Sequence, residues 1–272
     1  MDAAFKITRL QDRVIQIENE LENCCTLVLG RERALLFDTM CGLGDLRGTV
    51  ESLTDLPLTV VNSHGHYDHV GGNFQFEQVY RSKKDWYMAE EARPVFDTLQ
   101  MNINRDLSNA WKSMLRKDNL LDLTEGMVFD LGGVKARAVA LPGHTQGSMG
   151  LLLPELGLLL AGDAVSPTMC LFYPDSPGLE VYKATLDKVM SMDFRYFIQG
   201  HFSRLFPKAV LARFRECADL PGKAKSYFYQ NSHIPLYTGR VYILEIRNRE
   251  LGTMICLIDK EPSAAGTGES RA

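Results

Sequence analysis

The stretch His64-Gly65-His66-Tyr67-Asp68-His69 places three imidazoles and one carboxylate within six residues. It follows the apolar run LTVVNS (58–63) and leads into Val70-Gly71-Gly72-Asn73, so we expect a loop at the end of a buried strand. In an extended or turning backbone, the side chains of residues i and i+2 lie on one side. His64 and His66 can therefore bind one metal ion, while Asp68 and His69 point elsewhere and can bind a second.

Three further segments end a predicted strand with glycine followed by histidine or aspartate. They are Pro142-Gly143-His144 after VKARAVAL, Gly162-Asp163 after GLLLA, and Gly200-His201 after FRYFIQ. Because glycine permits a sharp turn out of a sheet, we expect these three strand ends and the one that leads into the H-x-H-x-D-H stretch to gather their side chains at one sheet edge. The mixture of imidazole nitrogen and carboxylate oxygen suits zinc, with iron or manganese as alternatives.

In chain order, the motifs H-x-H-x-D-H, PGHT, GD and GH resemble those of the metallo-β-lactamase-fold superfamily over about residues 5–205. The resemblance implies an α/β (α+β) fold of the αββα type, a four-layer sandwich. It also implies two divalent ions in two ligand sets joined by a bridging Asp163: His64, His66 and His144 for one ion, and Asp68, His69 and His201 for the other.

This ligand set predicts a metal-dependent hydrolase in which metal-bound hydroxide attacks the substrate. Two divalent ions outweigh the charge of two aspartates and a hydroxide, so the site stays positive and can polarise a carbonyl or phosphoryl oxygen. Water on such ions has a pKa of about 7. Asp68 is also expected to orient the water, and Tyr173 to donate a hydrogen bond to a carbonyl oxygen.

The bond that is cleaved is expected to be a small-molecule lactone, ester or thioester. The string NSHGHYDHVGGN (62–73) resembles acyl-homoserine-lactone lactonases, whereas the segment AVSPTMCLFYPDSPG lacks the basic glutathione-binding region of glyoxalase II-like enzymes. Three alternatives stay open: a mononuclear iron persulfide dioxygenase of the same fold, a β-lactamase-like amide hydrolase, and a non-catalytic metal-binding sensor.

Composition and charge limit the classes of partner that this protein is expected to bind. The formal net charge of -4 and the absence of a Lys/Arg cluster argue against a nucleic-acid partner. The pattern of a signal peptide and a long apolar span are both missing, so we expect a cytoplasmic protein with no membrane partner. None of the six cysteines lies in a C-x-x-C pair, and we expect reduced cysteines that fill the core.

The chain is expected to form a single domain over residues 1–262. Apolar residues at helical spacing predict a helical insertion at 83–118, and VYILEIR with MICLID predicts a hairpin within 240–259. Further helices are expected near 45–55, 179–191 and 207–219. The Ser/Gly/Ala-rich tail at 263–272 is expected to be disordered.

Several side chains near the motifs allow two interpretations. The aromatic residues either line the pocket or pack the core: Tyr67, Phe172, Tyr173 and Tyr182 near the ligands, and Trp86 and Trp111 as a lid on the insertion. Asp38 either orients a ligand or shapes a turn. His233 lies outside every motif and is interpreted as structural or as a surface residue.

Overall fold

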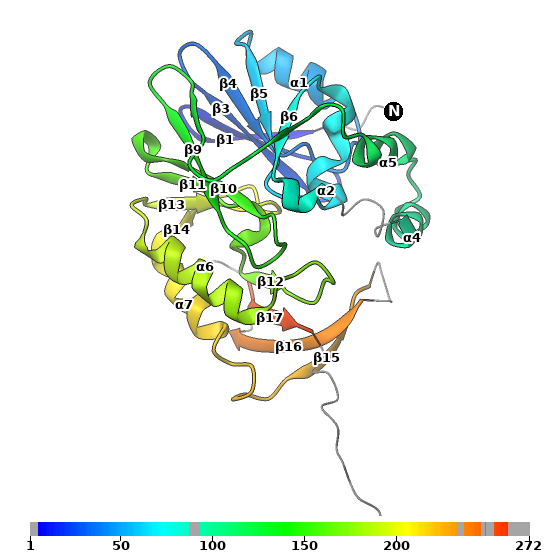
Figure 1. Ribbon diagram of the computed structural model, residues 1–272, viewed down its shortest axis with the longest axis vertical. Coiled ribbons are helices and arrows are strands. Elements are labelled where there is room, and N and C mark those ends of the chain that lie inside the picture. Colours follow the sequence, from blue (N-terminus) through cyan, green and yellow to red (C-terminus); the bar gives the residue numbers. More distant parts are fainter. Residues whose placement is uncertain (1–4, 87–92, 233–236, 246–247, 249–252, 261–272) are drawn as a thin grey trace, which may run out of the picture.

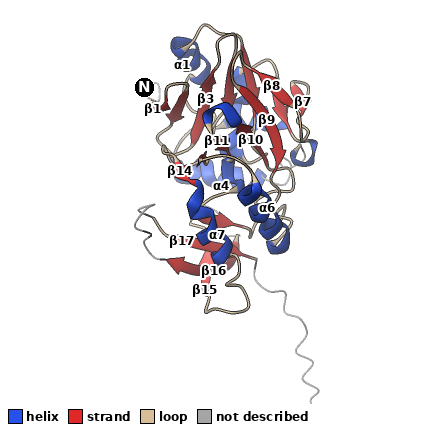
Figure 2. Ribbon diagram, turned by 90° about the vertical axis from the view of Figure 1, so that its left-hand side faces the viewer, coloured by secondary structure: helices blue, strands red, loops and turns tan. Residues whose placement is uncertain are grey.

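The computed structural model describes residues 5–86, 93–232, 237–245, 248 and 253–260. In this part of the chain the strands form three sheets, and helices cover them (Figures 1 and 2). The expected positions of the disordered tail and of His233 lie outside the described residues.

The first sheet comes from the N-terminal half of the chain. Within the described residues it has seven strands, in sheet order β1 (Lys6–Gln11), β2 (Val14–Glu18), β3 (Cys24–Leu29), β4 (Ala34–Phe37), β5 (Leu58–Val61), β6 (Val79–Arg81) and β7 (Leu120–Asp122). Strand β4 shows why the sheet is buried on both faces. Leu35 and Phe37 face the second sheet, while Ala34 and Leu36 face the outer layer, as the two-residue period of a strand requires.

The second sheet faces the first across the central core. In the described chain its order is β14 (Phe206–Pro207), β13 (Tyr196–Ile198), β11 (Leu158–Leu160), β10 (Met149–Leu153), β9 (Lys135–Ala140) and β8 (Val128–Asp130). The predicted hairpin of β10 and β11 is present. Leu158 and Leu160 of β11 pack toward the first sheet, whereas Leu159 packs outward.

Helices cover the outer faces of both sheets. Leu46 and Val50 of α1 (Leu46–Leu53) pack on the first sheet, and Leu186 of α6 (Leu179–Ser191) and Phe214 of α7 (Leu211–Cys217) pack on the second. The predicted αββα fold is therefore confirmed. Helices α1 and α6 begin within two residues of their expected positions. Helix α7 follows a short 3-10 turn at Lys208–Val210, which lies where the third helix was expected to begin.

A third sheet extends the predicted four layers. In the described residues it has the order β12 (Thr168–Cys170), β17 (Ile255–Asp259), β16 (Thr238–Glu245) and β15 (Tyr227–Gln230), so the expected C-terminal hairpin is only part of it. Ile255 and Leu257 join the same core cluster as α6 and α7, which therefore lie between the second and third sheets (Figures 1 and 2).

The expected helical insertion forms α4 (Arg93–Ile103) and α5 (Ser108–Leu115) in its described part. Phe96, Leu99 and Met114 pack with Val70, which belongs to the short helix α2 (Tyr67–Val70) inside the H-x-H-x-D-H stretch. The insertion thus covers the apolar side of the ligand loop.

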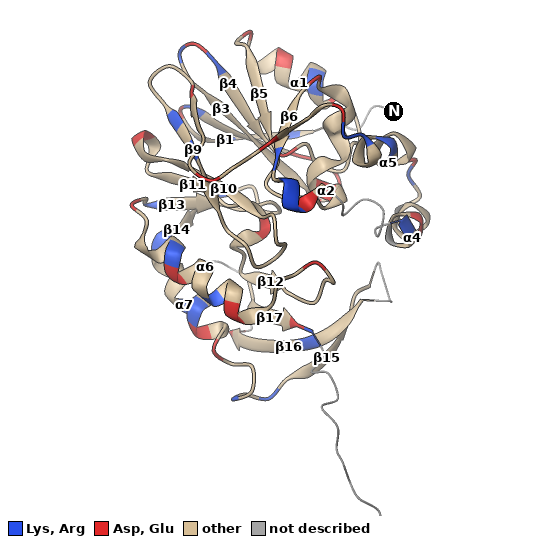
Figure 3. Cartoon of the chain, in the orientation of Figure 1, with Lys and Arg blue, Asp and Glu red and all other residues tan. Residues whose placement is uncertain are grey.

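Charged residues lie mainly on the outer helices and loops (Figure 3). Opposite charges meet between α6 and α7, where Lys183 lies 3.5 Å from Asp219 and Arg215 lies 2.9 Å from Asp187. Such exposed pairs contribute about 1 kcal/mol or less each. Within the described residues, no helix combines the length and apolar composition needed to cross a membrane.

Candidate metal centre

All seven predicted ligands lie together, at the ends of strands from two sheets. The H-x-H-x-D-H loop follows β5 of the first sheet, while His144, Asp163 and His201 follow β9, β11 and β13 of the second. The expectation of one sheet edge was wrong. The centre lies where the edges of two facing sheets meet, because β9, β11 and β13 run in the same direction and end on the side where β5 ends.

The first ligand set consists of three imidazoles. His66 Nδ1 lies 3.0 Å from His64 Nε2 and 2.9 Å from His144 Nε2. His64 and His144 are buried, so these nitrogens converge away from bulk water. Three converging imidazole nitrogens form a common set of zinc ligands in proteins.

The second set lies closer to solvent and contains a carboxylate. Asp68 Oδ2 lies 3.9 Å from His69 Nε2 and 3.6 Å from His201 Nε2. Asp163 reaches both sets: its Oδ2 lies 3.0 Å from His201 Nε2 and 3.8 Å from His144 Nε2. The geometry therefore provides two groups of donors with one carboxylate between them.

Two buried atoms at the centre have no hydrogen-bond partner, which tests whether a metal fits. His69 Nε2 and Asp163 Oδ1 lie 3.5 Å apart, and neither forms a hydrogen bond. Buried polar atoms without a hydrogen bond are costly, and a cation between these two would satisfy both. Gly200 leaves the space for this approach, since a Cβ there would lie 2.5 Å from Asp163 Oδ1. The donor set thus fits divalent cations.

The ring nitrogens that face away from the centre are held by other groups. His64 Nδ1 lies 2.9 Å from Ser63 Oγ, and His144 Nδ1 lies 2.9 Å from the carbonyl oxygen of Cys170. A partner on the far nitrogen fixes the tautomer and the orientation of a metal-binding imidazole. The two rings therefore present Nε2 to the centre.

Carboxylates contact the outward-facing ring nitrogens of two more predicted ligands. Asp38 Oδ2 lies 2.9 Å from His69 Nδ1 and also accepts the Ser63 hydroxyl at 2.8 Å, which supports the interpretation that Asp38 orients a ligand. Asp175 Oδ2 lies 3.4 Å from His66 Nε2. Sequence reasoning missed Ser63 and Asp175. Asp175 stands in a loop far from every histidine motif, and no signal in the sequence distinguishes it from a turn residue.

Histidines of the two ligand sets differ in the direction of their pKa shifts. Burial lowers the pKa of His64 well below its usual range and that of His144 to about 4, so these rings are neutral. Burial also works against a charge on His201, but Asp163 outweighs it and raises the pKa of His201 to about 9. Asp163 and Asp38 likewise raise the pKa of His69 well above its usual value against the effect of burial. The carboxylates thus favour positive charge on the two histidines of the second ligand set.

The aromatic candidates divide into one site residue and several core residues. The ring of Tyr173 lies 4.8 Å from that of His66 and 5.4 Å from that of His144. Tyr182 of α6, in contrast, is 1% exposed and belongs to the core cluster between the second and third sheets. It packs against Gly143, which supports the packing interpretation for this residue.

The tryptophans of the insertion pack against the protein. Trp86 donates from Nε1 to the carbonyl oxygen of Arg81 at 3.0 Å and packs against the core beneath α1. The ring of Trp111 lies 5.2 Å from that of Phe96. Tyr67 packs against the same cluster as Trp111 and Phe96. These contacts favour the packing interpretation over a lid.

The two asparagines of the NSHGHYDHVGGN string hold the loop in shape. Asn73 Nδ2 donates to Asn62 Oδ1 at 2.8 Å, and Asn62 Nδ2 donates to the carbonyl oxygen of His69 at 3.1 Å. Thr39 Oγ1 donates to Asn73 Oδ1 at 2.8 Å. All three side chains are buried, so the string is a structural support for the ligands.

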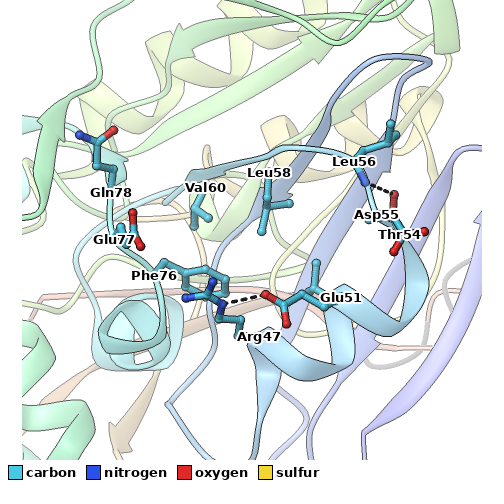
Figure 4. Close-up of a pocket in the computed structure, with 11 residues that line it drawn as sticks. Arg47, Glu51, Thr54, Asp55, Leu56, Leu58, Val60, Phe76, Glu77 and Gln78 are labelled. Carbon is cyan, nitrogen blue, oxygen red and sulfur yellow. Dashed lines mark hydrogen bonds and ion pairs between the residues drawn. The ribbon is translucent and has the colours of Figure 1, made fainter.

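An open pocket of about 650 Å³ lies beside α1 and β5 (Figure 4). Its polar rim includes Arg47, which binds Glu51 at 2.8 Å, and its apolar floor includes Leu58, Val60 and Phe76. None of the seven ligands lines it. This pocket therefore has no part in the metal centre.

Comparison with known proteins shows the family of the chain. The family model of the metallo-beta-lactamase superfamily matches residues 22–201, a span that contains all seven predicted ligands. The chain belongs to the metallo-beta-lactamase superfamily. The match ends at His201, so β14 to β17 lie beyond it.

Several curated relatives are named as hydrolases. The human acyl-coenzyme A thioesterase MBLAC2 is 24% identical over 200 residues, which cover 65% of this chain and 72% of the relative. The hydroxyacylglutathione hydrolase GloC of Haemophilus influenzae is 27% identical over 161 residues, covering 56% and 70%. The prediction that the chain is a metal-dependent hydrolase of this superfamily is confirmed.

Solved structures confirm the fold. The archaeal metallo-beta-lactamase superfamily protein ST1585 from Sulfolobus tokodaii superposes with a TM-score of 0.57 at 16% identity, covering 77% of this chain and 84% of that protein. At this identity the likeness concerns the fold alone.

Proposed function

We propose that this chain hydrolyses acyl thioesters at a centre of two zinc ions. The observation that carries the proposal is the pair of three-residue ligand sets joined by Asp163. His64, His66 and His144 would hold the first ion, and Asp68, His69 and His201 the second. When bound, such ions lower the pKa of a coordinated water and polarise a carbonyl oxygen.

Asp68 has a second role in this proposal. Its side chain is 15% exposed, so water reaches it, while His69 beside it is buried. Oδ2 faces the imidazoles, and the other carboxylate oxygen can accept a proton from the attacking water. Asp68 would thus orient the nucleophile and hold its proton.

Tyr173 would bind the carbonyl oxygen of the substrate. Its ring lies beside His66 and His144 and is partly exposed. Burial raises the pKa of Tyr173 well above its usual value, so the hydroxyl keeps its proton and can donate a hydrogen bond. A donor aimed at the oxygen where negative charge develops stabilises the transition state.

The leaving group favours a thioester over an amide. An ordinary thiol has a pKa of about 8.5, so a thiolate departs with little assistance, whereas an amine must be protonated first. A thiolate leaving group therefore needs no general acid, and Asp68 need only take up the proton of the attacking water. Two relatives, an acyl-coenzyme A thioesterase and a hydroxyacylglutathione hydrolase, are named for acyl thioester substrates.

A substrate panel with zinc-loaded protein tests the proposal. The panel holds acyl-coenzyme A of several chain lengths, an acylglutathione, a lactone, an aryl ester and a β-lactam. We expect the highest kcat/KM for a thioester, lost on chelation and in Asp163→Asn but retained in Asp187→Asn, an exposed carboxylate on α6. Oxygen uptake with glutathione persulfide and no hydrolysis would favour the iron dioxygenase. No turnover by metallated protein would favour the sensor.

A cytoplasmic location stays a prediction from the sequence.

A further inference from the structure

A buried carboxylate outside the seven ligands contacts both loops that carry the first ligand set. Asp85 Oδ2 accepts the backbone N–H of Gly65 at 3.1 Å and the hydroxyl of Thr145 at 2.7 Å. Its Oδ1 accepts the backbone N–H of Gly147 at 2.7 Å. Gly65 lies between His64 and His66, and Thr145 follows His144, so one side chain joins loops that are about 80 residues apart in the sequence.

Local structure aims Asp85 at this point. Strand β6 ends at Arg81, and a 3-10 turn over Lys83–Asp85 follows, with the Asp85 N–H bound to the carbonyl oxygen of Ser82 at 3.0 Å. On the far side of the turn, Lys83 N–H donates to Asp122 Oδ1 at 3.1 Å. The turn is therefore anchored to β7 at its start and presents Asp85 to the ligand loops at its end.

The burial of Asp85 requires these contacts. The residue is 2% exposed, and burial raises its pKa, while the hydrogen bonds of Thr145 and Gly147 lower it. An ionised carboxylate without such donors would strongly destabilise the folded chain at a buried position. The fit is also tight, because a Cβ at position 147 would lie 2.3 Å from Asp85 Oδ1. Thr145 Oγ1 also lies 2.8 Å from Ser148 Oγ, which fixes the hydroxyl.

We propose that Asp85 is a positioning residue that sets the separation of His66 and His144 for the first metal ion. Through Gly65 it holds the loop of the first sheet, and through Thr145 and Gly147 it holds the loop of the second. His66 Nδ1 and His144 Nε2, one on each loop, lie 2.9 Å apart. The inference rests on the metal centre of the proposed function and is independent of the acyl group that is cleaved.

The test compares zinc affinity in matched variants of the full chain. Asp85→Asn keeps the shape of the side chain but replaces one acceptor oxygen with an NH2 group that faces a donor. Thr145→Val removes one of the three hydrogen bonds, and Thr145→Ser restores the hydroxyl. Asp122→Asn is the control, because Asp122 anchors the same turn without contact to a ligand loop.

We expect about 10- to 100-fold weaker binding of the first zinc ion in Asp85→Asn, measured by competition with a chromogenic chelator. Bound Co²⁺ should give an altered visible spectrum, since its absorption follows its coordination geometry. Thr145→Val should weaken binding in the same direction, and Thr145→Ser and Asp122→Asn should match the native chain.

Three outcomes would overturn the inference. Zinc affinity within twofold of native and an unchanged Co²⁺ spectrum in folded Asp85→Asn would do so. If Asp85→Asn fails to fold, equal zinc affinities of Thr145→Val and Thr145→Ser would do so instead, and a deficit confined to Thr145→Val would support it. If the native chain binds no zinc, the metal centre of the proposed function fails and the positioning role fails with it.

Discussion

His69 Nε2 and Asp163 Oδ1 face each other across 3.5 Å at the meeting point of the two sheets, both buried and both without a hydrogen-bond partner. One atom belongs to the loop after β5, and the other follows β11. Native structures rarely bury polar atoms without a hydrogen bond. A cation bound by both atoms would satisfy them, so we expect metal binding to stabilise the contact between the two sheets.

The first prediction concerns metal content and stability. Purified without chelator, the chain should contain about two metal ions, because its donors form two sets around Asp163. Chelation should lower Tm, and free zinc at about 100 times its Kd should restore about 2.7 kcal/mol per site. Elemental analysis and thermal unfolding measure both effects. A single ion per chain after supplementation with zinc or manganese would contradict the two-ion centre.

The second prediction isolates the bridge. Asp163→Asn removes the charge that joins the two sets, while His64, His66 and His144 remain. We expect the first ion to stay, the second to be lost on dialysis, and kcat to fall by at least about 100-fold. Asp187→Asn on α6 is the control for loss of an aspartate charge. If the Asp163 variant keeps both ions and native turnover, Asp163 does not bridge.

The third prediction concerns Asp38, which accepts Ser63 N–H at 2.6 Å and lies 2.9 Å from His69 Nδ1. Asp38→Asn should weaken the second ion about 10- to 100-fold through His69 and cost about 1–3 kcal/mol of stability. The φ of Asp38 is 70°, a conformation that Asn adopts more readily than Ala. Asp38→Ala should therefore be less stable than Asp38→Asn in urea unfolding. Equal unfolding midpoints for the two variants would contradict this explanation.

That the seven candidate ligands would lie together could be predicted because their signals are local in the sequence. Three histidines and an aspartate in one loop, and a glycine before His144, Asp163 and His201 at strand ends, need no knowledge of the tertiary fold. Asp85 and Asp175 could not be found in this way. Each is a single aspartate in a turn, and its role arises from contact with a loop that is distant in the sequence.

The third sheet was missed for a related reason. Strand β12 has only three residues, and it pairs in parallel with β17, which lies more than 80 residues further along the chain. Periodicity over three residues does not distinguish a strand from a loop. The predicted hairpin of β16 and β17 was found because its two strands are adjacent in sequence and long enough to show their pattern.

The fourth prediction concerns the cysteines, which are unpaired in the structure and mostly buried. Burial raises the pKa of Cys24 and of Cys217 to about 12 and that of Cys41 to about 11. Since an exposed thiol has a pKa of about 8.5, the native chain should react slowly with Ellman's reagent at pH 8. All six thiols should react after denaturation.

The same shifts predict a pH effect on stability. Because the folded pKa values exceed the unfolded value, the stabilisation from protonated thiols is present below about pH 8.5 and is lost as the pH rises toward the folded values. The urea midpoint should therefore fall between about pH 7.5 and pH 9.5. Rapid labelling of several thiols in the native state would contradict both expectations.

The fifth prediction tests Tyr173 as the donor to the substrate carbonyl. Tyr173→Phe removes only the hydroxyl and keeps the ring beside His66, His144 and Phe172. A hydrogen bond that strengthens in the transition state affects kcat more than KM, so we expect kcat to fall about 100-fold with little change in KM. Metal content should stay native, because the hydroxyl is not among the seven ligands.

Tyr229→Phe on β15 is the matched control, since its ring contacts Phe172 at 5.3 Å without a ring contact to the ligands among the described residues. If Tyr173→Phe raises KM alone, the hydroxyl binds the ground state, and if both constants stay native, Tyr173 only packs against His66.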